Sequence, residues 1–476
     1  MKKYSLNSLS KGAHVHLMGI CGTAMASLAG LLKDKGFKVT GSDSHPYPPM
    51  STQIESLGIQ IMKPYAAANL NPQPDFVIVG NVISASNQEA QEMIRLQIPH
   101  GSLPQAMGEF IIADRNSFVI SGTHGKTTTT SMISWILDQA GYQPGFLIGG
   151  IPKNFEKSFR NPAQNTFVIE GDEYDTAYFD KVPKFIHYKP QQVILTSVEF
   201  DHADIYKDLD HVKSAFRRLM ELIPATGNFV FWGDEANVKD VANTCQIKNK
   251  FSFGFIPDNH FVIQMSGEND KASKFKILIN NKELVEIEIQ QIGKYNVLNA
   301  AAAAIITYLN KVPLHHISEA LKSFQGVKRR QEILGEFRGV TLIEDFAHHP
   351  TAVKQTIEAV QKKYAPRKVF SIFEPRSATS RRKVFQNDYL NAFKASQESI
   401  IAEAFDQSQL NDQDRFSTQE LVTELQNTGH KSHCFLTSDQ IVDYISAAAK
   451  PTDIVLIMSN GGFDGIYDKL IDKLRG

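Results

Sequence analysis

Short apolar runs alternate with stretches of helical periodicity at the start of the chain. Residues 14–20 (HVHLMGI) predict a strand, residues 25–35 carry apolar positions at helical spacing, and residues 37–40 predict a second strand. A further apolar run at 76–79 ends at a glycine. Because this alternation is typical of a parallel sheet covered by helices, we expect residues 1–115 to form a Rossmann-like unit.

The same alternation begins again near residue 117, and we expect a central unit over residues 116–328. Its apolar strands are expected at 117–121, 166–169 and 193–196. Residues 226–290 have a different pattern, and short alternating strands such as 275–279 and 284–289 indicate an antiparallel appendage on the parallel core. An alanine-rich helix is expected at 296–309.

A third unit is expected over residues 329–476. Apolar strands at 341–344, 368–373, 399–402 and 453–458 alternate there with helical stretches. This pattern predicts another doubly wound sheet. Three units also agree with the length of the chain, since a domain typically has ~150 residues and the chain has 476. The junctions near residues 115 and 328 are the expected hinges.

Composition excludes several classes of protein. Lys and Arg number 50 and Asp and Glu 51, so the chain lacks the basic excess of a typical nucleic-acid-binding protein. We interpret the basic runs at 328–330 and 381–383 as solvated surface. Three widely separated cysteines fit neither a disulfide framework nor a zinc site and indicate a reducing compartment. Without a signal-peptide core or an apolar stretch of ~18 residues, we expect a cytoplasmic protein with no membrane partner.

A glycine–lysine turn in VISGTHGKTTTTSM, residues 119–132, carries the strongest chemical signal. Gly125, Lys126 and Thr127 fit the end of a Walker loop, but Gly122 shows that this loop is shorter than the standard one. The N-terminus of a helix offers unpaired N–H groups to phosphate, and a threonine hydroxyl can bind Mg²⁺. The alternative, a threonine-capped helix start, does not require Gly-Lys. The predicted nucleotide contacts are Gly122, Thr123, His124, Gly125, Lys126, Thr127 and Thr128.

The N-terminal unit has a glycine turn of its own, residues 19–24, where a dinucleotide fingerprint would lie. It departs from that fingerprint at Cys21 and Ala24. Asp43, at the end of the next strand, could accept a hydrogen bond from a ribose hydroxyl. A bound nucleotide-like group and a plain tight turn both remain open as interpretations.

Acidic side chains follow two strands of the central sheet. They are Glu170, Asp172, Glu173 and Asp175 after the first strand, and Glu199, Asp201 and Asp204 with His202 after the second. Charges this dense repel one another unless a cation is present, and oxygen ligands suit Mg²⁺, for which imidazole is a less usual partner. A solvated acidic loop and a hydrogen-bonding loop histidine are the alternatives. Because catalytic groups gather at the carboxyl ends of such strands, both segments are expected near the lysine turn.

Further polar groups begin the alanine-rich helix and follow two strands of the third unit. Asn296 and Asn299 share one helix face and could read an adenine edge, although capping or surface polarity explains them equally well. Asp345, His348, His349 and Arg376 lie at strand ends, where a substrate carboxylate could meet a cation. Ordinary loop polarity is the alternative for this second group.

Taken in order, the motifs GTHGKTTT, IEGDE, EFDHAD, NVLNA and DFAHHPT resemble the Mur ligase family, whose ATP-dependent enzymes build the peptide of bacterial peptidoglycan. The resemblance spans nearly the whole chain. GTHGKT and the histidine pair resemble the branch that acts on UDP-N-acetylmuramate. Within it, GICGTAMA, SDSHPYPPMS, DEYDTAYFDKVPKFIHYKP and FEPRS are closer to the member that ligates the recycled tripeptide L-Ala-γ-D-Glu-meso-diaminopimelate than to the member that adds L-alanine.

The resemblance implies an α/β fold with an N-terminal Rossmann-like sheet that binds UDP-N-acetylmuramate, a central P-loop ATPase-like sheet and a C-terminal Rossmann-like sheet for the peptide. It assigns Lys126 to the β- and γ-phosphates, Thr127 with Glu170 to one Mg²⁺, and His202 to a second Mg²⁺. The implied ATP contacts outside the turn are Asn296, Asn299, Arg330 and Asp345. The implied contacts to the UDP-sugar are Gly19, Gly22, Thr23, Asp43, Ser84, His124 and Arg376. The modified lysine of some family members has no assigned position here, since Lys213 and Arg217 both lie near the expected spacing.

The implied reaction begins when the lactyl carboxylate of UDP-N-acetylmuramate attacks the γ-phosphate of ATP to form an acyl phosphate. The tripeptide amine then attacks the acyl carbon, phosphate leaves and an amide remains. The implied catalytic residues are Lys126, Glu170, His202 and His348, with His348 or His349 as the possible base. We expect ATP and Mg²⁺ as cofactors, small-molecule substrates as the only partners, and a monomer or weak homo-oligomer. The alternatives are an enzyme that adds free L-alanine and a nucleotide-binding sensor or dehydrogenase.

Overall fold

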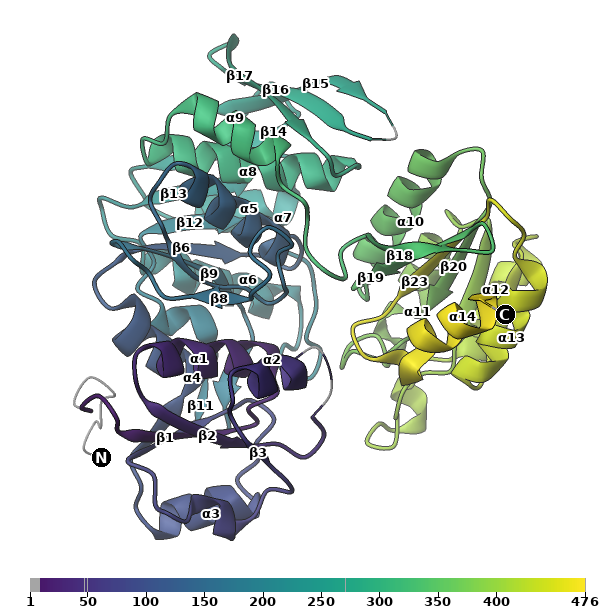
Figure 1. The fold of residues 1–476 in the computed structure, drawn as a ribbon. Helices are drawn as coiled ribbons and strands as arrows, with labels where there is room; N and C mark the ends of the chain where they lie inside the picture. Colours follow the sequence, from purple (N-terminus) through teal and green to yellow (C-terminus); the bar gives the residue numbers. More distant parts are fainter. Residues whose placement is uncertain (1–8, 47, 49, 270, 476) are drawn as a thin grey trace.

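The computed structural model describes residues 9–46, 48, 50–269 and 271–475. Residues 1–8, which belong to the segment where no signal peptide is expected, lie outside the described residues, as do Tyr47 and Pro49 of the SDSHPYPPMS motif. Figure 1 shows an N-terminal unit and a central unit stacked on each other, with the C-terminal unit beside them. Among the described residues, no helix is long and apolar enough to cross a membrane.

The N-terminal unit is a parallel five-stranded sheet in the order β3-β2-β1-β4-β5. Its strands are β1 (His14–Met18), β2 (Lys38–Ser42), β3 (Ile61–Met62), β4 (Phe76–Val79) and β5 (His100–Ser102), and its helices are α1 (Thr23–Asp34), α2 (Met50–Ser56), α3 (Gln88–Arg95) and α4 (Leu103–Ala106). The first strand is two residues shorter than predicted, because Gly19 takes a φ of 78° and Ile20 turns with it. Both residues donate their N–H groups to the carbonyl of Ser42.

The central unit is a ten-stranded sheet in the order β17-β16-β15-β14-β13-β12-β6-β9-β7-β8. Its strands are β6 (Asn116–Ser121), β7 (Gly145–Leu147), β8 (Phe159–Arg160), β9 (Thr166–Gly171), β12 (Gln192–Leu195), β13 (Asn228–Trp232), β14 (Lys250–Gly254), β15 (Phe261–Glu268), β16 (Ser273–Ile279) and β17 (Lys282–Ile289). Its helices are α5 (Lys126–Gln139), α6 (Leu209–Glu221), α7 (Ala236–Asn243), α8 (Lys294–Leu309) and α9 (Leu314–Lys322), and β10 (Asp175–Ala177) and β11 (Asp180–Pro183) form a separate hairpin.

The predicted antiparallel appendage is correct only in part. Strands β13 and β14 continue the parallel sheet, and β14 still pairs in parallel with β15. Antiparallel pairing begins with β15, β16 and β17. Helix α7 connects β13 to β14, and a helical connection returns the chain to the same end of the sheet and so allows these two strands to pair in parallel.

The C-terminal unit is a six-stranded sheet in the order β18-β19-β23-β20-β21-β22, in which only the edge strand β18 runs antiparallel. Its strands are β18 (Glu332–Phe337), β19 (Val340–Asp345), β20 (Val369–Phe373), β21 (Glu398–Ala402), β22 (Ser432–Phe435) and β23 (Ile454–Met458). Its helices are α10 (Pro350–Tyr364), α11 (Gln386–Phe393), α12 (Thr418–Asn427), α13 (Ser438–Ala448) and α14 (Ile466–Arg475). The predicted α/β class with three parallel-rich sheets is confirmed.

The first two units share one apolar core. A single cluster joins Leu28 of α1 to Phe159 and Phe167 of the central sheet, and a Cβ at Gly30 would lie 2.0 Å from the Cζ of Phe159. The clusters of the C-terminal unit contain described residues from 334 onward, with Phe200 as the one contribution from the central unit. Opening near residue 115 would therefore split a packed core, whereas opening near residue 328 would not.

Candidate active site

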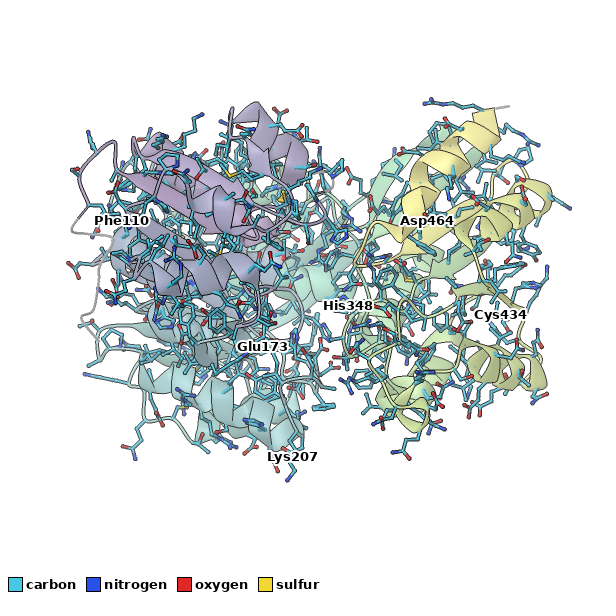
Figure 2. All side chains as sticks on the ribbon, turned by 90° about the horizontal axis from the view of Figure 1, so that it is seen from below. Phe110, Glu173, Lys207, His348, Cys434 and Asp464 are labelled. Carbon is cyan, nitrogen blue, oxygen red and sulfur yellow. The ribbon has the colours of Figure 1, made fainter. Side chains whose placement is uncertain are left out.

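A cavity of about 1040 Å³ opens where the three units meet. Most of the predicted site residues line it, namely Gly19, Gly22, Thr23, Asp43, Thr123, His124, Gly125, Lys126, Thr127, Thr128, Glu170, His202, Asn296, Asn299, Arg330, Asp345 and His348. Figure 2 shows His348 at the boundary between the C-terminal unit and the other two, on the side toward Glu173. Two of these residues, Gly19 and His348, are 329 positions apart in the sequence and line the same cavity.

The glycine–lysine turn depends on two glycines with left-handed backbone. Gly125 is the N-cap of α5 at a φ of 83°, and a Cβ there would lie 2.4 Å from Oδ1 of Asn299. Gly122 has a φ of 127°, and its Cβ would lie 2.2 Å from Oγ1 of Thr196. Gly122 packs against Thr196 and Ser197 and does not line the cavity, whereas Gly125 does. The turn can therefore keep its shape only with glycine at both positions.

Lys126 is the first residue of α5, and its side chain lines the cavity. Nζ donates to the carbonyl of Gly122 at 2.6 Å and lies 3.1 Å from Oε2 of Glu173. The two side chains are 13% and 3% exposed. Burial lowers the pKa of Lys126, but the carboxylates of Glu173 and Asp172 outweigh burial and raise it overall. Lys126 is therefore a fixed cation at this site.

The acidic side chains at residues 170–175, at the end of β9 and just after it, are largely neutralised by lysines of the same chain. The pairs are Asp172–Lys184 at 3.1 Å, Glu173–Lys126 at 3.1 Å and Asp175–Lys181 at 2.6 Å. Among the described residues, Glu170 has no cationic partner within 4 Å. Its carboxylate accepts hydrogen bonds from the Thr127 hydroxyl at 2.9 Å and from the N–H of Gly149. Burial and the charge of Asp172 raise the pKa of Glu170, and the more distant charge of Lys126 only partly offsets them.

His202 lies on the loop after β12 in a left-handed conformation, with a φ of 52°. Its N–H donates to Oδ1 of Asp201 at 2.7 Å, and its Nε2 lies 3.6 Å from Oε1 of Glu173. The Thr379 hydroxyl of the C-terminal unit also donates to Oδ1 of Asp201, at 2.7 Å. Burial opposes ionisation of Asp201, but the imidazoles of His202 and of the histidine pair hold its pKa well below the usual range. The position of the C-terminal unit is thus linked to the loop that carries His202.

A second link runs through Glu199 on the same loop. Its Oε2 accepts a hydrogen bond from the Thr351 hydroxyl at 2.6 Å, and lies 3.4 Å from Nδ1 of His349 and 3.6 Å from Nε2 of His124. Burial opposes ionisation of Glu199, but these neighbours outweigh it and lower its pKa to about 2. Burial, with a smaller effect of His124, lowers the pKa of His349 to about 4. His124 and His349 therefore meet across the boundary between two units.

His348 has one ring nitrogen available. Its Nδ1 lies 3.1 Å from the carbonyl of Phe346, so Nδ1 carries the proton and donates it. No hydrogen bond between described residues uses Nε2 of His348. Burial lowers the pKa of His348, so the ring is neutral at pH 7. The geometry favours His348 over His349 as a proton acceptor, because both nitrogens of His349 have polar neighbours.

The basic run at 328–330 is not solvated surface, which corrects the sequence interpretation. Only Lys328 is exposed. Arg329 pairs with Glu344, and Arg330 points toward the Thr127 hydroxyl, with an NH2 to Oγ1 distance of 3.5 Å. Burial lowers the pKa of Arg330. In the run at 381–383, only Lys383 is exposed. A run of charges in the sequence does not reveal which of its members find partners in another segment.

Two predicted UDP-sugar contacts do not reach the cavity. Ser84 is exposed and bonds to the hydroxyl of Ser86 at 2.9 Å. Arg376 stacks on Phe405 and pairs with Glu374 at 3.2 Å within the C-terminal unit. Asp43 does line the cavity, but its carboxylate already accepts hydrogen bonds from the backbone N–H groups of Cys21 and His45.

The two positions considered for a modified lysine also lie away from the cavity. Lys213 and Arg217 both pair with Asp240 and do not line the cavity.

Comparison with known proteins identifies the family. Residues 14–115 match the Mur ligase family, catalytic domain; residues 120–307 match the Mur ligase middle domain; and residues 329–461 match the Mur ligase, glutamate ligase domain. The chain belongs to the Mur ligase family. The middle-domain match contains Lys126, Glu170 and His202, and the glutamate ligase match contains Asp345 and His348.

Individual Mur ligases match along their whole length. The UDP-N-acetylmuramate–L-alanyl-γ-D-glutamyl-meso-2,6-diaminoheptandioate ligase of Escherichia coli (strain K12) is 36% identical over 97% of this chain and 98% of its own. The UDP-N-acetylmuramate–L-alanine ligase of Desulfitobacterium hafniense (strain Y51) is 28% identical over 96% of this chain and 99% of its own. The crystal structure of a murein peptide ligase from Psychrobacter arcticus 273-4 superposes with a TM-score of 0.76 at 32% identity and covers 98% of this chain and 99% of that one.

Three residues at the Mur ligase site were not singled out by the sequence. Lys184 is a buried lysine that lines the cavity and neutralises Asp172. Thr351 and Thr379 connect the C-terminal unit to the loop after β12. The surplus of carboxylates at 170–175 was a signal that cations must lie nearby, but it did not say which lysine. Thr351 ends the motif DFAHHPT and Thr379 follows FEPRS, but neither segment indicates that its threonine bonds to the loop after β12.

Proposed function

We propose that the chain catalyses ATP-dependent amide formation between the lactyl carboxylate of UDP-N-acetylmuramate and the amine of L-Ala-γ-D-Glu-meso-diaminopimelate. The observation that carries this proposal is the 36% identity, over nearly the full length, to a ligase named for these two substrates. The L-alanine ligase match is weaker, at 28%. The higher identity of the first match supports the tripeptide over free L-alanine as the amine substrate. Because both relatives are ligases, the matches also support a ligase over a sensor or dehydrogenase.

The same proposal divides the work among three domains, 1–115 for the UDP-sugar, 116–328 for ATP and 329–476 for the peptide. Their separate sheets and the cavity between them support this division. For the nucleotide we propose the turn from Gly122 to Thr128 with Asn296, Asn299, Arg330 and Asp345. For the sugar we retain Gly19, Gly22, Thr23, Asp43 and His124, whereas Ser84 and Arg376 have no support from the geometry. We further propose that the enzyme acts in the cytoplasm as a monomer or weak homo-oligomer.

Thr127 and Glu170 fit a magnesium ion. Their oxygens are 2.9 Å apart, and Glu170 is the acidic residue of its segment that lacks a lysine partner. Hard oxygen ligands of this kind suit Mg²⁺, which supplies positive charge to the phosphates when bound. His202 is the proposed ligand of a second Mg²⁺.

The residues of the chain provide positioning and proton transfer. Lys126 neutralises the phosphoryl oxygens as the lactyl carboxylate attacks the γ-phosphate, which brings two anions together. His348 then accepts the proton that the attacking amine must lose, through its available Nε2. The links through Thr351 and Thr379 hold the C-terminal unit against the site and keep water from the acyl phosphate.

A panel of amines tests the substrate. Purified protein with UDP-N-acetylmuramate, ATP and Mg²⁺ is offered the tripeptide, L-alanine, a lysine-containing tripeptide or no amine, and phosphate release and product mass are measured. The tripeptide should turn over at least about 100-fold faster than L-alanine. Equal or faster use of L-alanine would reassign the chain to the other branch. If no amine releases phosphate, the sensor or dehydrogenase hypothesis replaces the ligase.

A further inference from the structure

Three side chains converge on the cavity wall outside the proposed magnesium site. His124 comes from the turn after β6, Glu199 from the loop after β12, and His349 is the N-cap of α10. Oε2 of Glu199 lies 3.4 Å from Nδ1 of His349 and 3.6 Å from Nε2 of His124. One potential ligand atom from each residue lies within 4.8 Å of the other two. All three residues line the cavity.

The hydrogen bonds fix the position of the proton on His349, and they leave Nε2 of His124 without a partner. Nε2 of His349 lies 3.1 Å from the carbonyl of Phe200, which can only accept, so Nε2 carries the proton. Nδ1 therefore has a lone pair; it accepts one long hydrogen bond, from the N–H of Thr351 at 3.3 Å, and faces Glu199. Nε2 of His124 is buried without a hydrogen-bond partner. Among the described residues, only the Thr351 hydroxyl donates a hydrogen bond to the Glu199 carboxylate.

We propose that His124, Glu199 and His349 form a binding site for a divalent transition-metal ion of the Zn²⁺ class. Two imidazoles and one carboxylate are a known set of protein ligands for Zn²⁺, with the fourth position left open. Bonds of roughly 2.0–2.1 Å in a tetrahedron place ligand atoms about 3.3 Å apart, close to the 3.4 and 3.6 Å observed. Because all three residues line the cavity, we expect the fourth position to face it. Mg²⁺ is a poor candidate, because it prefers oxygen ligands.

A bound ion would connect the turn of Lys126 directly to α10 of the C-terminal unit. In the structure the Thr351 hydroxyl links α10 to Glu199 on the loop after β12, and this hydrogen bond can break when the unit moves. Three metal–ligand bonds would hold the same segments together through the cycle. Ion binding itself is independent of the proposed function. The predicted consequence, inhibition of turnover because substrates and products must pass this boundary, rests on that function.

Co²⁺ is the probe, because its visible absorption reports coordination number and ligand type. The full chain, free of ATP and Mg²⁺, is titrated with CoCl₂. We expect one equivalent to give intense bands of a four- or five-coordinate site, with no thiolate charge-transfer band. Excess Mg²⁺ should not displace it and one equivalent of Zn²⁺ should. X-ray absorption at the cobalt edge should count two imidazoles.

Two variants remove one ligand each and keep the local hydrogen bonds. Glu199→Gln retains an acceptor for Thr351, and His349→Asn retains a good N-cap for α10. Removing a group that hydrogen-bonds to a metal ligand weakens metal binding roughly 10–100-fold. Removing a ligand itself should therefore weaken binding at least about 100-fold. The matched control is His315→Gln with His316→Gln, an adjacent histidine pair on α9 whose ring centroids are 4.1 Å apart.

The control should bind Co²⁺ as the wild type does. The proposal is overturned if the wild type shows no stoichiometric binding, if X-ray absorption counts fewer than two imidazoles, if both ligand variants bind normally, or if the control loses the signal. Far-UV circular dichroism checks the fold of each variant. Buffered free Zn²⁺ should inhibit phosphate release by the wild type near its dissociation constant, with at least about tenfold less sensitivity in Glu199→Gln. Binding without inhibition refutes the consequence and leaves the site, and a wild type with no turnover refutes the proposed function alone.

Discussion

Replacing Lys126 with alanine removes the cation that pairs with a buried carboxylate and that we propose binds the phosphates of ATP. The ammonium lies 3.1 Å from Glu173, and the two side chains are 13% and 3% exposed. At an effective dielectric constant of about 20, charges at that distance attract by about 5 kcal/mol. Removing one partner of such a buried pair typically costs about 3–5 kcal/mol, because the remaining charge is left uncompensated. Lys126→Ala should therefore lose stability as well as activity.

The loss of activity has its own magnitude. An ammonium about 4 Å from a phosphoryl oxygen at the same dielectric constant contributes about 4 kcal/mol, which corresponds to about a thousandfold in rate. The double variant Lys126→Ala with Glu173→Gln separates the two effects, because it removes the orphaned charge without restoring the cation. We expect this variant to regain most of the lost unfolding free energy and none of the lost turnover.

Urea unfolding and phosphate release in the presence of both substrates measure these quantities. Lys126→Ala should unfold at lower urea and release phosphate at least about a thousandfold more slowly. If the single variant released phosphate at a rate within tenfold of the wild-type rate, the proposal that Lys126 binds the phosphates would be wrong. If the double variant regained activity along with stability, the role of Lys126 would be structural, and the assignment of the turn would fail.

Three further predictions concern the turn, the base and the boundary between units. Gly125→Ala, whose Cβ would lie 2.4 Å from Oδ1 of Asn299 at a φ of 83°, should weaken ATP binding at least about tenfold in calorimetry, and unchanged binding would contradict the turn geometry. Burial lowers the pKa of His348, so kcat should stay constant through neutrality and fall only below about pH 6.5. His348→Gln should lower kcat and abolish this fall at acidic pH. If kcat of the variant still falls at acidic pH, another group is responsible. Thr379→Val breaks a 2.7 Å hydrogen bond to a buried carboxylate and should lower kcat about ten- to hundredfold, while Thr379→Ser restores it; equal rates for Val and Ser would refute the link.

Much of the molecule was predictable because its signals are local. The strand before Lys126, the two glycines of its turn and the helix after it lie within a few residues of one another, so a phosphate site could be predicted from one segment. The alternation of strands and helices likewise predicted the three sheets. The order of the motifs then pointed to the Mur ligase family, and the family matches confirm it.

The tertiary structure decided which polar groups have partners, because those partners come from distant segments. Arg330 occurs in a run that resembled solvated surface, yet contact with the Thr127 region encloses it. Arg376 follows a strand end like its neighbours, but a stacking contact with Phe405 holds it away from the cavity.

The hinge is decided in the same way. Both domain junctions look alike in the sequence, but Gly30 of the first unit packs against Phe159 of the second, so a continuous core crosses the first junction. Mostly polar contacts, such as Thr351 with Glu199, connect the third unit to the other two. A local pattern specifies an element and its buried face, whereas the identity of what covers that face depends on how the whole chain packs.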